Sequence, residues 1–521
     1  MMPPGRSEFS SESQSAFVTE GKTRQESGIN TFSILQIILT IGAIQVATMA
    51  FNLLRSKIVA VTAGPESVGV ISVIDQAVGL IALISTFSLP FASVKFLSAA
   101  HSESREAFTK GYITFLRALF LISLLGTGVG IALIWGWPAI LGKELAEYKE
   151  VVTLALLAIP ATNLIGLLMN VMAAAQRVRA SALLGLLTAI LLAIVSGGGI
   201  LIAGLHGYYT GNLAVTFALV AGGMWYLFRR EGLRIHDKQV KLFQEVRRYP
   251  QALSFAGALY IISFTTPLAY LVARYAVLRA GGFIESGLLQ AAMGLGLALK
   301  TVMRSSNALF LTPTMNRKGE NREKFQRAVE FLRALSVVIG IIALPMVLFP
   351  NWWLFLLYSS KFAAAAPYVY LFVLSEAIQL LAGVNQALVI GLDHIAIHVK
   401  VCLLGDLGIM AFSWWLVPYY GIGGVAMAFL FNGLLIFTLT SWYLWSNHRI
   451  VIHKSIGWLP LYILAIIGVG GAVSSWSEVN TPGFLILKIC LWTLFILSLF
   501  KFIGGKKGPL LQSLWQAFSH K

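Results

Sequence analysis

The chain has 521 residues, of which 57% are hydrophobic and 12% are charged, and its mean hydropathy is +0.78. A water-soluble globular chain carries about 25% charged residues, so the composition excludes that class of protein. Apolar stretches of roughly 20 residues, the length that an α-helix needs to cross a bilayer, recur along the whole chain. We therefore predict an all-α polytopic membrane protein.

The N-terminal segment, residues 1–30, is polar and of mixed charge, and no apolar stretch lies near Met1. A secretory signal peptide has an apolar core close to its start. We therefore predict a disordered cytoplasmic tail at residues 1–30 and no cleaved signal.

A long apolar run covers residues 32–65 and is interrupted by Arg55, Ser56 and Lys57. It is too long for one straight span, so we predict a long, bent first helix. A cation at the centre of a membrane helix costs about 2.5–3.5 kcal/mol on insertion scales and usually faces a water-filled cavity or a partner. We expect Arg55 and Lys57 to offer positive charge to the path of an anionic molecule. The alternative is that both side chains extend to the outer headgroups.

The apolar windows predict about fourteen spans. The spans begin near Thr31, Val68, Gly111, Val151, Ser181, Gly211, Gln251, Phe283, Leu335, Tyr368, Lys400, Gly421, Gly457 and Gly483.

The segments between the spans alternate in charge, and one set carries most of the Lys and Arg residues, including the stretches 229–248 and 317–327. The positive-inside rule assigns that set, and with it both termini, to the cytoplasm. Many Trp and Tyr residues, Tyr208 and Tyr209 among them, fall at the predicted outer ends of spans, as in an interfacial belt.

The net charge of +17 follows from the same bias. It suits the anionic inner leaflet of a membrane, and no nucleic-acid-binding module accompanies the basic stretch 229–248. We therefore predict contact with membrane lipid and no nucleic-acid partner.

Two parts of the chain resemble each other about six spans apart. Residues 103–108 (ESREAF) match residues 320–325 (ENREKF), and in each copy an arginine, Arg55 or Arg274, precedes a glycine that ends the span. An even number of spans preserves orientation, so the copies are parallel repeats. We predict two parallel six-helix lobes around a central cavity, with the first and seventh helices lining the gap, plus a C-terminal helix pair.

The domain organisation follows from this repeat. Thr265, Thr266 and Pro267 predict a break in the seventh span, comparable with the bend expected in the first. After the N-terminal tail at 1–30, the predicted parts are an N-terminal lobe at 31–230, a basic cytoplasmic linker at 231–250, a C-terminal lobe at 251–447, and the additional helix pair with a basic cytoplasmic C-terminus at 448–521.

Ionisable residues inside the spans are the functional candidates, because a charge in the membrane is costly. Lys300 and Arg304 lie four residues apart near the inner end of the eighth span, hence on one face of a helix. The alternative for Arg304 is that its side chain extends to the inner surface. The residues predicted to line a cationic, substrate-binding cavity are Arg55, Lys57, Arg274, Lys300 and Arg304.

Three carboxylates also lie within the spans, at Asp75, Glu376 and Asp406. Each is either a proton or sodium site for ion coupling or the buried partner of a nearby cation. Asp75 is the most informative of the three, because its span should flank the first.

Enzyme signatures are missing from the sequence. No phosphate-binding loop of the kind that ATP coupling requires occurs, and the histidines are scattered without metal-ligand spacing. No extracytoplasmic connection is longer than about 15 residues, a length typical of connectors and not of catalytic domains. We predict a transporter and not an enzyme, with no metal and no cofactor.

Residues 52–69 (NLLRSKIVAVTAGPESVG) resemble the first-helix signature of oligosaccharide-lipid flippases, in which a cation is followed by an apolar stretch, a small residue, Gly-Pro or Gly, and another Gly. These flippases, including O-antigen flippases of the Wzx type, form the polysaccharide transporter branch of the multidrug/oligosaccharidyl-lipid/polysaccharide (MOP) superfamily. The similarity continues through residues 85–99 and covers the first hundred residues well. The rest of the chain matches by span count and lobes.

The resemblance implies a two-lobed flippase that alternates between inward- and outward-open states. It would move an undecaprenyl-pyrophosphate-linked oligosaccharide repeat unit across the cytoplasmic (inner) membrane of a bacterium, for synthesis of O-antigen or another surface polysaccharide. A cationic cavity would hold the pyrophosphate and sugar, while the lipid tail stays in the bilayer. The implied protein partners are a polysaccharide polymerase and glycosyltransferases, and two complete lobes predict action as a monomer.

Three alternatives stay open. A lipid II-type peptidoglycan precursor flippase would also carry an arginine where Arg55 lies, and the additional helix pair resembles the pair that forms a lipid groove in those proteins. Such flippases follow that arginine with an aspartate, whereas Ser56 stands here. A cation or drug exporter of the same superfamily would line its cavity with carboxylates. A non-transport scaffold or polymerase of a polysaccharide-assembly complex would tolerate neutralisation of Arg55, Lys57 and Arg274 together.

Overall fold

Helices make up nearly all of the regular structure. The computed structural model describes residues 31–86, 89–137, 142–233, 250–306, 321–392, 394–448, 459–476 and 482–502. No strand occurs in these ranges. The predicted tail at 1–30, the linker residues 234–249 and the basic C-terminal residues 503–521 lie outside the described residues.

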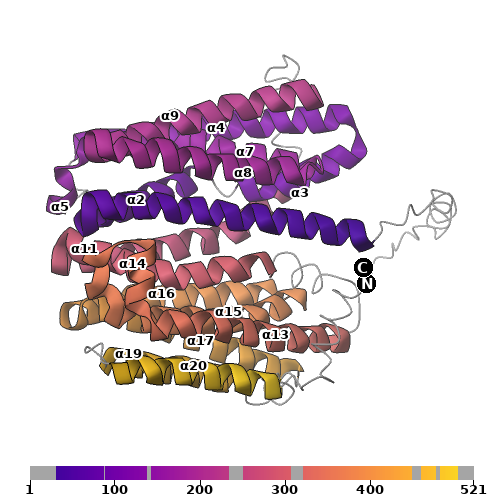
Figure 1. Cartoon of the computed structure of the whole chain (residues 1–521). Coiled ribbons are helices and arrows are strands. Elements are labelled where there is room, and N and C mark those ends of the chain that lie inside the picture. Colours follow the sequence, from indigo (N-terminus) through magenta and orange to yellow (C-terminus); the bar gives the residue numbers. More distant parts are fainter. Residues whose placement is uncertain are drawn as a thin grey trace, which may run out of the picture.

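Two groups of helices correspond to the two predicted lobes. The N-terminal lobe, in the upper half of Figure 1, consists of α2 (Thr31–Thr86), α3 (Leu89–Glu103), α4 (Arg105–Gly136), α5 (Gly142–Ala146), α6 (Lys149–Leu157), α7 (Ile159–Ala174), α8 (Val178–Leu191), the π-helical turn η2 (Leu192–Ser196) and α9 (Gly197–Glu231). The C-terminal lobe lies below it and consists of α11 (Pro250–Ser306), α13 (Asn321–Leu348), α14 (Pro350–Leu357), the 3-10 turn η4 (Ser360–Ala365), α15 (Ala366–Gly391), α16 (Ile395–Tyr420) and α17 (Ile422–His448).

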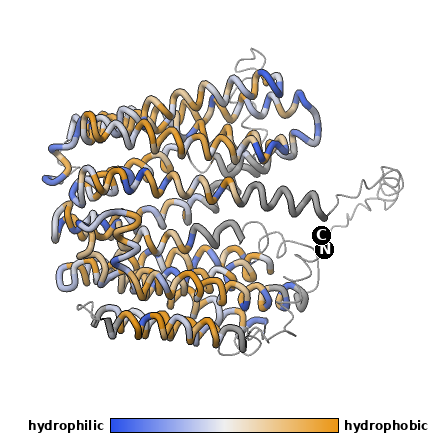
Figure 2. Tube along the Cα trace, viewed as in Figure 1, coloured by the Kyte–Doolittle hydropathy of each residue, from blue (hydrophilic) through white to orange (hydrophobic). Residues whose placement is uncertain are grey.

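Nine helical stretches among the described residues are long and apolar enough to cross a membrane. Three of them, Ala43–Thr86, Val178–Glu231 and Ser263–Lys300, contain 44, 54 and 38 residues, and roughly 20 suffice for one crossing. With those three counted twice, the length and composition of the described helices allow twelve crossings. Shorter apolar stretches lie in α19 (Leu459–Trp476) and α20 (Pro482–Phe502). Figure 2 shows apolar residues along the middle of the helices and hydrophilic residues gathered toward their ends. The predicted all-α polytopic fold is confirmed.

Each of the three long stretches turns at a glycine. Gly64 in α2 has φ 74° and ψ −174°, Gly282 in α11 has φ 73° and ψ −168°, and Gly204 in α9 has φ 57°. Glycine adopts positive φ at no steric cost, whereas other residue types are strained there. The nearly equal dihedrals at Gly64 and Gly282 support the internal repeat. The three glycines lie at the end of the helices where Figure 1 labels α5 and α14 (left), which we call the turn end. The opposite end, where α8 begins after Arg177 and α9 ends after Arg229, we call the basic end.

The seventh span is not broken where the sequence predicts a break. α11 runs through Thr265, Thr266 and Pro267, and Gly282 is its one non-helical residue. The prediction was wrong because membrane helices tolerate proline, and the two threonine hydroxyls bond to a neighbouring helix. Gly64 is likewise the one non-helical residue of α2, so the bend comes at the end of the first crossing and not within it.

α2 and α11 pack against each other along the boundary between the lobes. A Cβ added at Gly69 would overlap the carbonyl group of Phe283, and a Cβ added at Gly287 would overlap that of Pro65. These four residues form a reciprocal pair next to the two glycine turns, which we call the glycine contact. Two helix backbones approach this closely only where side chains are missing, so the glycine contact joins the lobes at the turn end.

The apolar cores show that α2 belongs to both lobes. One cluster of buried side chains extends from the C-terminal lobe across α11 to α2, where it includes Ile74. A second cluster lies inside the N-terminal lobe, around Leu119 on α4 and Leu168 on α7. α2 also contacts α4, α8 and α9 of its own lobe. A change in the position of α2 would therefore alter the packing of both cores.

The additional helix pair lies on the C-terminal lobe. α19 packs on α13 and α15, and α20 packs on α13. The ring of Phe495 lies against Gly340, and the hydroxyl of Tyr462 donates a hydrogen bond of 2.7 Å to Oγ of Ser498. Figure 1 shows the pair at the edge of the C-terminal lobe that faces away from the N-terminal lobe. It takes no part in the boundary between the lobes.

Candidate substrate cavity between the lobes

A cavity of about 440 Å³ lies between α2, α9 and α11, at the boundary of the two lobes. On the second crossing of α2 its lining extends from Val68 to Leu83, a stretch about 22 Å long at a rise of about 1.5 Å per residue. The cavity therefore begins beside the glycine contact and extends toward the basic end. Its polar lining residues are Arg55, Ser56, Ser72, Asp75, Gln76, Tyr208, Arg274, Gln290 and Tyr358.

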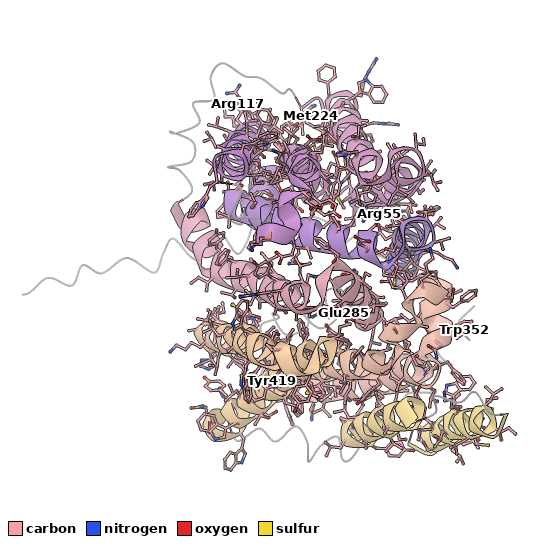
Figure 3. The ribbon with its side chains drawn as sticks, turned by 90° about the vertical axis from the view of Figure 1, so that its left-hand side faces the viewer. Arg55, Arg117, Met224, Glu285, Trp352 and Tyr419 are labelled. Atoms are coloured by element: carbon pink, nitrogen blue, oxygen red, sulfur yellow. The ribbon has the colours of Figure 1, made fainter. Side chains whose placement is uncertain are left out.

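The N-terminal lobe contributes a cation and a carboxylate to this cavity. Arg55 is half-buried, and its guanidinium carbon lies 5.9 Å from the centre of the Tyr208 ring, in a cation–π arrangement. Asp75 accepts a hydrogen bond of 2.9 Å from the hydroxyl of Tyr209 and interacts electrostatically with Arg55. Figure 3, a view along the helices, labels Arg55 on α2 between the two lobes. The two buried tyrosines thus hold the charged groups at the edge of the cavity.

The C-terminal lobe contributes Arg274, which is only 5% exposed. Its Nη2 atom donates a hydrogen bond of 2.5 Å to Oε1 of Gln290. The Nε and Nη1 atoms are buried and have no hydrogen-bond partner among the residues that the structure describes. A buried unpaired donor costs about 1–3 kcal/mol, and more when it is charged. The guanidinium therefore lies beside the cavity with two donors that the described residues leave unpaired.

A neutral side chain connects the two sides of the cavity. Nε2 of Gln76 on α2 donates a hydrogen bond of 3.0 Å to the carbonyl oxygen of Pro267 on α11. Gln76 directly follows Asp75, so this bond ties the segment that carries the carboxylate to the opposite lobe. A movement of the lobes apart would break it.

Comparison with known proteins agrees with this architecture. No protein-family model matches the chain. The lipid III flippase of Escherichia coli (strain K12) is 22% identical over 416 residues, which cover 78% of this chain and 97% of that protein. A structure of the lipid II flippase MurJ in an inward closed conformation superposes with a TM-score of 0.67 at 12% identity, over 89% of this chain and 99% of that one. An inward-facing multidrug resistance MATE family transporter of the MOP superfamily superposes with a TM-score of 0.61 at 13% identity, over 80% of this chain and 98% of that one.

The chain has the MOP-superfamily fold. The resemblance to the MOP superfamily is confirmed at the level of the fold, over nearly the whole chain. The proteins to which the chain is similar are named as flippases and transporters.

Within the MOP fold, two of the other predicted cations lie away from the cavity. Nζ of Lys57 donates a hydrogen bond of 2.8 Å to the carbonyl oxygen of Leu356 and lies 5.9 Å from the centre of the Phe355 ring. Lys57 therefore links α2 to α14 of the opposite lobe. Nζ of Lys300 lies 3.2 Å from a carboxylate oxygen of Glu376.

Lys300 also donates a hydrogen bond of 3.2 Å to Oε1 of Gln379, so its charge is engaged inside the C-terminal lobe. Arg304 belongs to α11, and its side chain lies outside the described part of the structure. Of the five predicted cations, the structure brings Arg55 and Arg274 together at one cavity.

The three carboxylates differ in their surroundings. Asp75 borders the cavity, whereas Glu376 is 3% exposed and forms its ion pair with Lys300. Oδ2 of Asp406 accepts hydrogen bonds of 2.7 and 2.8 Å from the hydroxyls of Thr265 and Thr266. Glu376 and Asp406 thus join helices within the C-terminal lobe, and Asp75 alone of the three faces the space between the lobes.

The sequence contained no signal for two cavity residues that interact with Arg274, and it misassigned two tyrosines that lie against Arg55 and Asp75. Gln290 and Tyr358 carry no signal in the sequence, because their proximity to Arg274 depends on the packing of α11 and the segment after α14. Tyr208 and Tyr209 were expected in an interfacial belt but are 3% and 1% exposed and lie against Arg55 and Asp75. That expectation was wrong because position near the end of a span does not determine which side of the helix faces lipid.

Proposed function

We propose that this chain is a flippase that moves a polyprenyl-pyrophosphate-linked oligosaccharide repeat unit across the cytoplasmic membrane of a bacterium, for assembly of O-antigen, exopolysaccharide or a similar surface polysaccharide. The observation that carries the proposal is the buried guanidinium of Arg274, which has two unpartnered donors among the described residues and shares a cavity with Arg55. The lipid III flippase of Escherichia coli and the lipid II flippase MurJ, to which the chain is similar, are both named for lipid cargo.

The charge of the cavity favours a phosphorylated substrate. Two arginines and one carboxylate line it, so its net charge is positive. Arginine offers planar, always-ionised donors that bind two phosphate oxygens at once. A pyrophosphate has oxygens enough to reach Arg274 on one side and Arg55 on the other, while Gln76 and Gln290 offer amide groups to sugar hydroxyls. A cation exporter would require an acidic lining instead.

The size of the cavity indicates which part of the substrate enters it. Its volume of about 440 Å³ lies within the range of about 300–1,000 Å³ that is usual for small-molecule sites. A pyrophosphate with its first sugars fits this range. A polyprenyl chain is apolar, so moving it from lipid into a polar cavity would not be favourable. The polyprenyl tail therefore stays in the bilayer while the head group crosses.

The two ends of the cavity differ in a way that suits alternating access. The glycine contact joins the lobes at the turn end, and the cavity extends from there toward the basic end. By the positive-inside rule the basic end, with both termini, faces the cytoplasm. In this arrangement the head group loads from the cytoplasm, and it is released when the glycine contact opens. The two lobes of one chain enclose the cavity, which suits action as a monomer between glycosyltransferases and a polymerase.

Asp75 is the best candidate for ion coupling. It is the carboxylate that borders the cavity, and the charge of Arg55 acts on it. Protonation of Asp75 would raise the net positive charge of the cavity by one and strengthen its hold on the pyrophosphate. Glu376 and Asp406 are buried partners of Lys300 and of two threonines, which suits a structural role.

A lipid II-type flippase is the second candidate. The additional pair α19 and α20 and the match to MurJ over 89% of this chain favour it. Lipid II carries the same pyrophosphate, so the same two arginines would serve. The two substrates are distinguished by the precursor that accumulates in depleted cells, a surface-polysaccharide repeat unit or a peptidoglycan precursor.

The test is flipping of a pyrophosphate-linked polyprenyl glycan in proteoliposomes. We expect Arg274→Gln to reduce the initial rate about 10- to 100-fold, since a charge-assisted hydrogen bond contributes about 1.5–3 kcal/mol, and Arg274→Lys to restore part of it. Arg279→Gln is the matched control. Arg279 lies on the same helix but is exposed and contacts Trp414, 5.8 Å from its ring centre. Unchanged transport by a folded Arg274→Gln protein would contradict the proposal.

A further inference from the structure

A second cavity, of about 890 Å³, lies on the N-terminal lobe between α8 and α9. It shares no lining residue with the cavity between the lobes. Leu183 and Leu187, one turn apart on α8, line it and are 53% and 46% exposed, so the space is open to the surface of the lobe. In a membrane protein such a surface is in contact with lipid. We call this space the α8–α9 groove.

Glycines explain why the groove opens at one end of the helix pair only. At the turn end, a Cβ at Gly199 would overlap the backbone of Gly207, and a Cβ at Gly211 would lie 2.9 Å from the carbonyl oxygen of Val195. The backbones of the first crossing (α8, η2 and the start of α9) and the second crossing (the rest of α9) therefore touch there. Toward the basic end Gly222 faces the groove, with no atom within 4 Å of the place where its Cβ would be. A larger side chain at this position would fill the groove.

The basic end of the groove carries an excess of positive charge. Arg177 and Arg179 line it where α8 begins. Arg229 and Arg230 follow in the last turn of α9, where the guanidinium of Arg229 lies 5.9 Å from the centre of the Trp225 ring. Glu231 is the one carboxylate in α8 and α9.

Nε of Arg177 donates to Glu231 at 2.9 Å, so this pair neutralises one of the four arginines. Arg179 is exposed beside the groove, where the amino-terminal end of α8 adds partial positive charge. Trp225, which also lines the groove, is of the residue type that is enriched where hydrocarbon meets headgroups. Toward the basic end, the apolar groove is thus followed by the aromatic ring of Trp225 and then by an excess of arginine.

We propose that the α8–α9 groove is a binding site for an anionic phospholipid of the leaflet at the basic end. An acyl chain lies along Leu183, Leu187 and Gly222, and the headgroup phosphate is bound by Arg179 at the start of α8. The charge complementarity selects an anionic headgroup, since a zwitterionic one would bring no net negative charge to the arginines. The bound lipid fills the space between helices whose backbones approach closely at the turn end, and α8 also contacts α2, which carries Arg55.

The test is lipid retention by the full-length protein, measured by native mass spectrometry after exchange into phosphatidylglycerol or phosphatidylcholine. We expect preferential retention of phosphatidylglycerol, reduced about tenfold in Gly222→Leu, which fills the groove, and in Arg179→Gln, which removes the charge. Millimolar inorganic phosphate should not displace the lipid, because it brings no acyl chain.

Two matched variants serve as controls. Gly198→Leu places the same side chain at another α9 glycine with open space around it, and Lys400→Gln removes an exposed charge on α16 of the other lobe, which does not line the groove. Both should retain phosphatidylglycerol as the unchanged protein does. Equal retention of the two lipids, displacement by inorganic phosphate alone, or normal retention by folded Gly222→Leu and Arg179→Gln proteins would each overturn the proposal.

Discussion

In the N-terminal lobe Arg55 shares the cavity with Asp75, whereas in the C-terminal lobe Arg274 is bonded to the neutral Gln290. The chain turns at Gly64 and Gly282 have nearly the same dihedrals, so the two halves can be compared position by position. The residue that lies as far beyond Gly282 as Asp75 lies beyond Gly64 is Met293, and it is buried. Arg55 lies nine residues before Gly64 and Arg274 eight residues before Gly282, so the repeat has kept the backbone turn and an arginine within one position but not the carboxylate.

This difference assigns different tasks to the two sides. Arg274 presents a permanent positive charge with two unpartnered donors among the described residues, which suits a fixed anchor for an anion. The charge of Arg55 is opposed by Asp75, so the attraction that this side exerts changes when the carboxylate gains a proton. The glycine contact, in contrast, is symmetric. Substitutions in the glycine contact should therefore affect both lobes alike, whereas substitutions of Arg55 and of Arg274 should differ in their effect on anion binding.

The largest expected effect comes from the glycine contact. Gly69→Leu and Gly287→Leu each place a side chain on a backbone carbonyl of the opposite lobe, so neither can keep the lobes together as they are. We expect the two variants to lose transport to the same extent and to destabilise this closed arrangement by about 1–3 kcal/mol or more, as overpacking does. Gly128→Leu, at a helical glycine of α4 with open space around it, should transport normally.

The distance between the lobes at the turn end provides the direct measurement. Spin labels at Lys143 on α5 and Trp352 on α14, both exposed and on opposite lobes, would report it by pulsed electron resonance once Cys402 and Cys490 are replaced by serine. We expect a longer distance in both leucine variants. A change in one variant only would show that the contact is not symmetric.

The next largest effect should separate the two arginines. We expect Arg274→Gln to weaken binding of a soluble pyrophosphate-linked analogue by about 10- to 100-fold, and Arg55→Gln to weaken it by a factor of about three to ten, because part of the Arg55 charge is already offset by Asp75. Titration calorimetry of the purified variants measures both. Equal losses of affinity in the two variants would contradict the distinction between Arg274 as a fixed anchor and Arg55 as a site whose attraction depends on Asp75.

A smaller effect of opposite sign is expected from Asp75→Asn. The amide can still accept the hydrogen bond from Tyr209 but no longer opposes Arg55, so the analogue should bind about three- to tenfold more tightly. Asp406→Asn is the control, because Asp406 is bonded to Thr265 and Thr266 inside the C-terminal lobe. It should leave the dissociation constant unchanged. Weaker binding by Asp75→Asn would contradict the proposed opposition of charges.

The smallest effect is expected at Lys57. Lys57→Gln removes one hydrogen bond to the Leu356 carbonyl, worth about 1–2 kcal/mol, and this bond joins the lobes outside the cavity. We expect a modest change in transport rate, about threefold, with no change in the dissociation constant of the analogue. A change in binding as large as that of Arg274→Gln would indicate that Lys57 contacts the substrate, as the sequence predicted.

Much of the fold could be predicted from the sequence. Spans follow from runs of apolar residues, and the repeat follows from an arginine and a turn glycine recurring about six spans apart. Arg55 and Arg274 were identifiable as candidates because a cation in a membrane helix needs a compensating environment. Pro267 was misread, because a residue that breaks helices in water is tolerated in a membrane helix.

The sequence by itself determined the all-α membrane class, the crossings, the glycine turns and the short set of charged residues that could matter, since each of these is a property of neighbouring residues. Only the tertiary structure decided which of those charges meet. It joined Lys300 to Glu376, directed Lys57 to α14, and brought Tyr209 to Asp75 from a distant part of the chain. These pairings depend on how each helix is rotated about its axis, and a rotation by one residue changes the facing side chain without changing the hydropathy of the span.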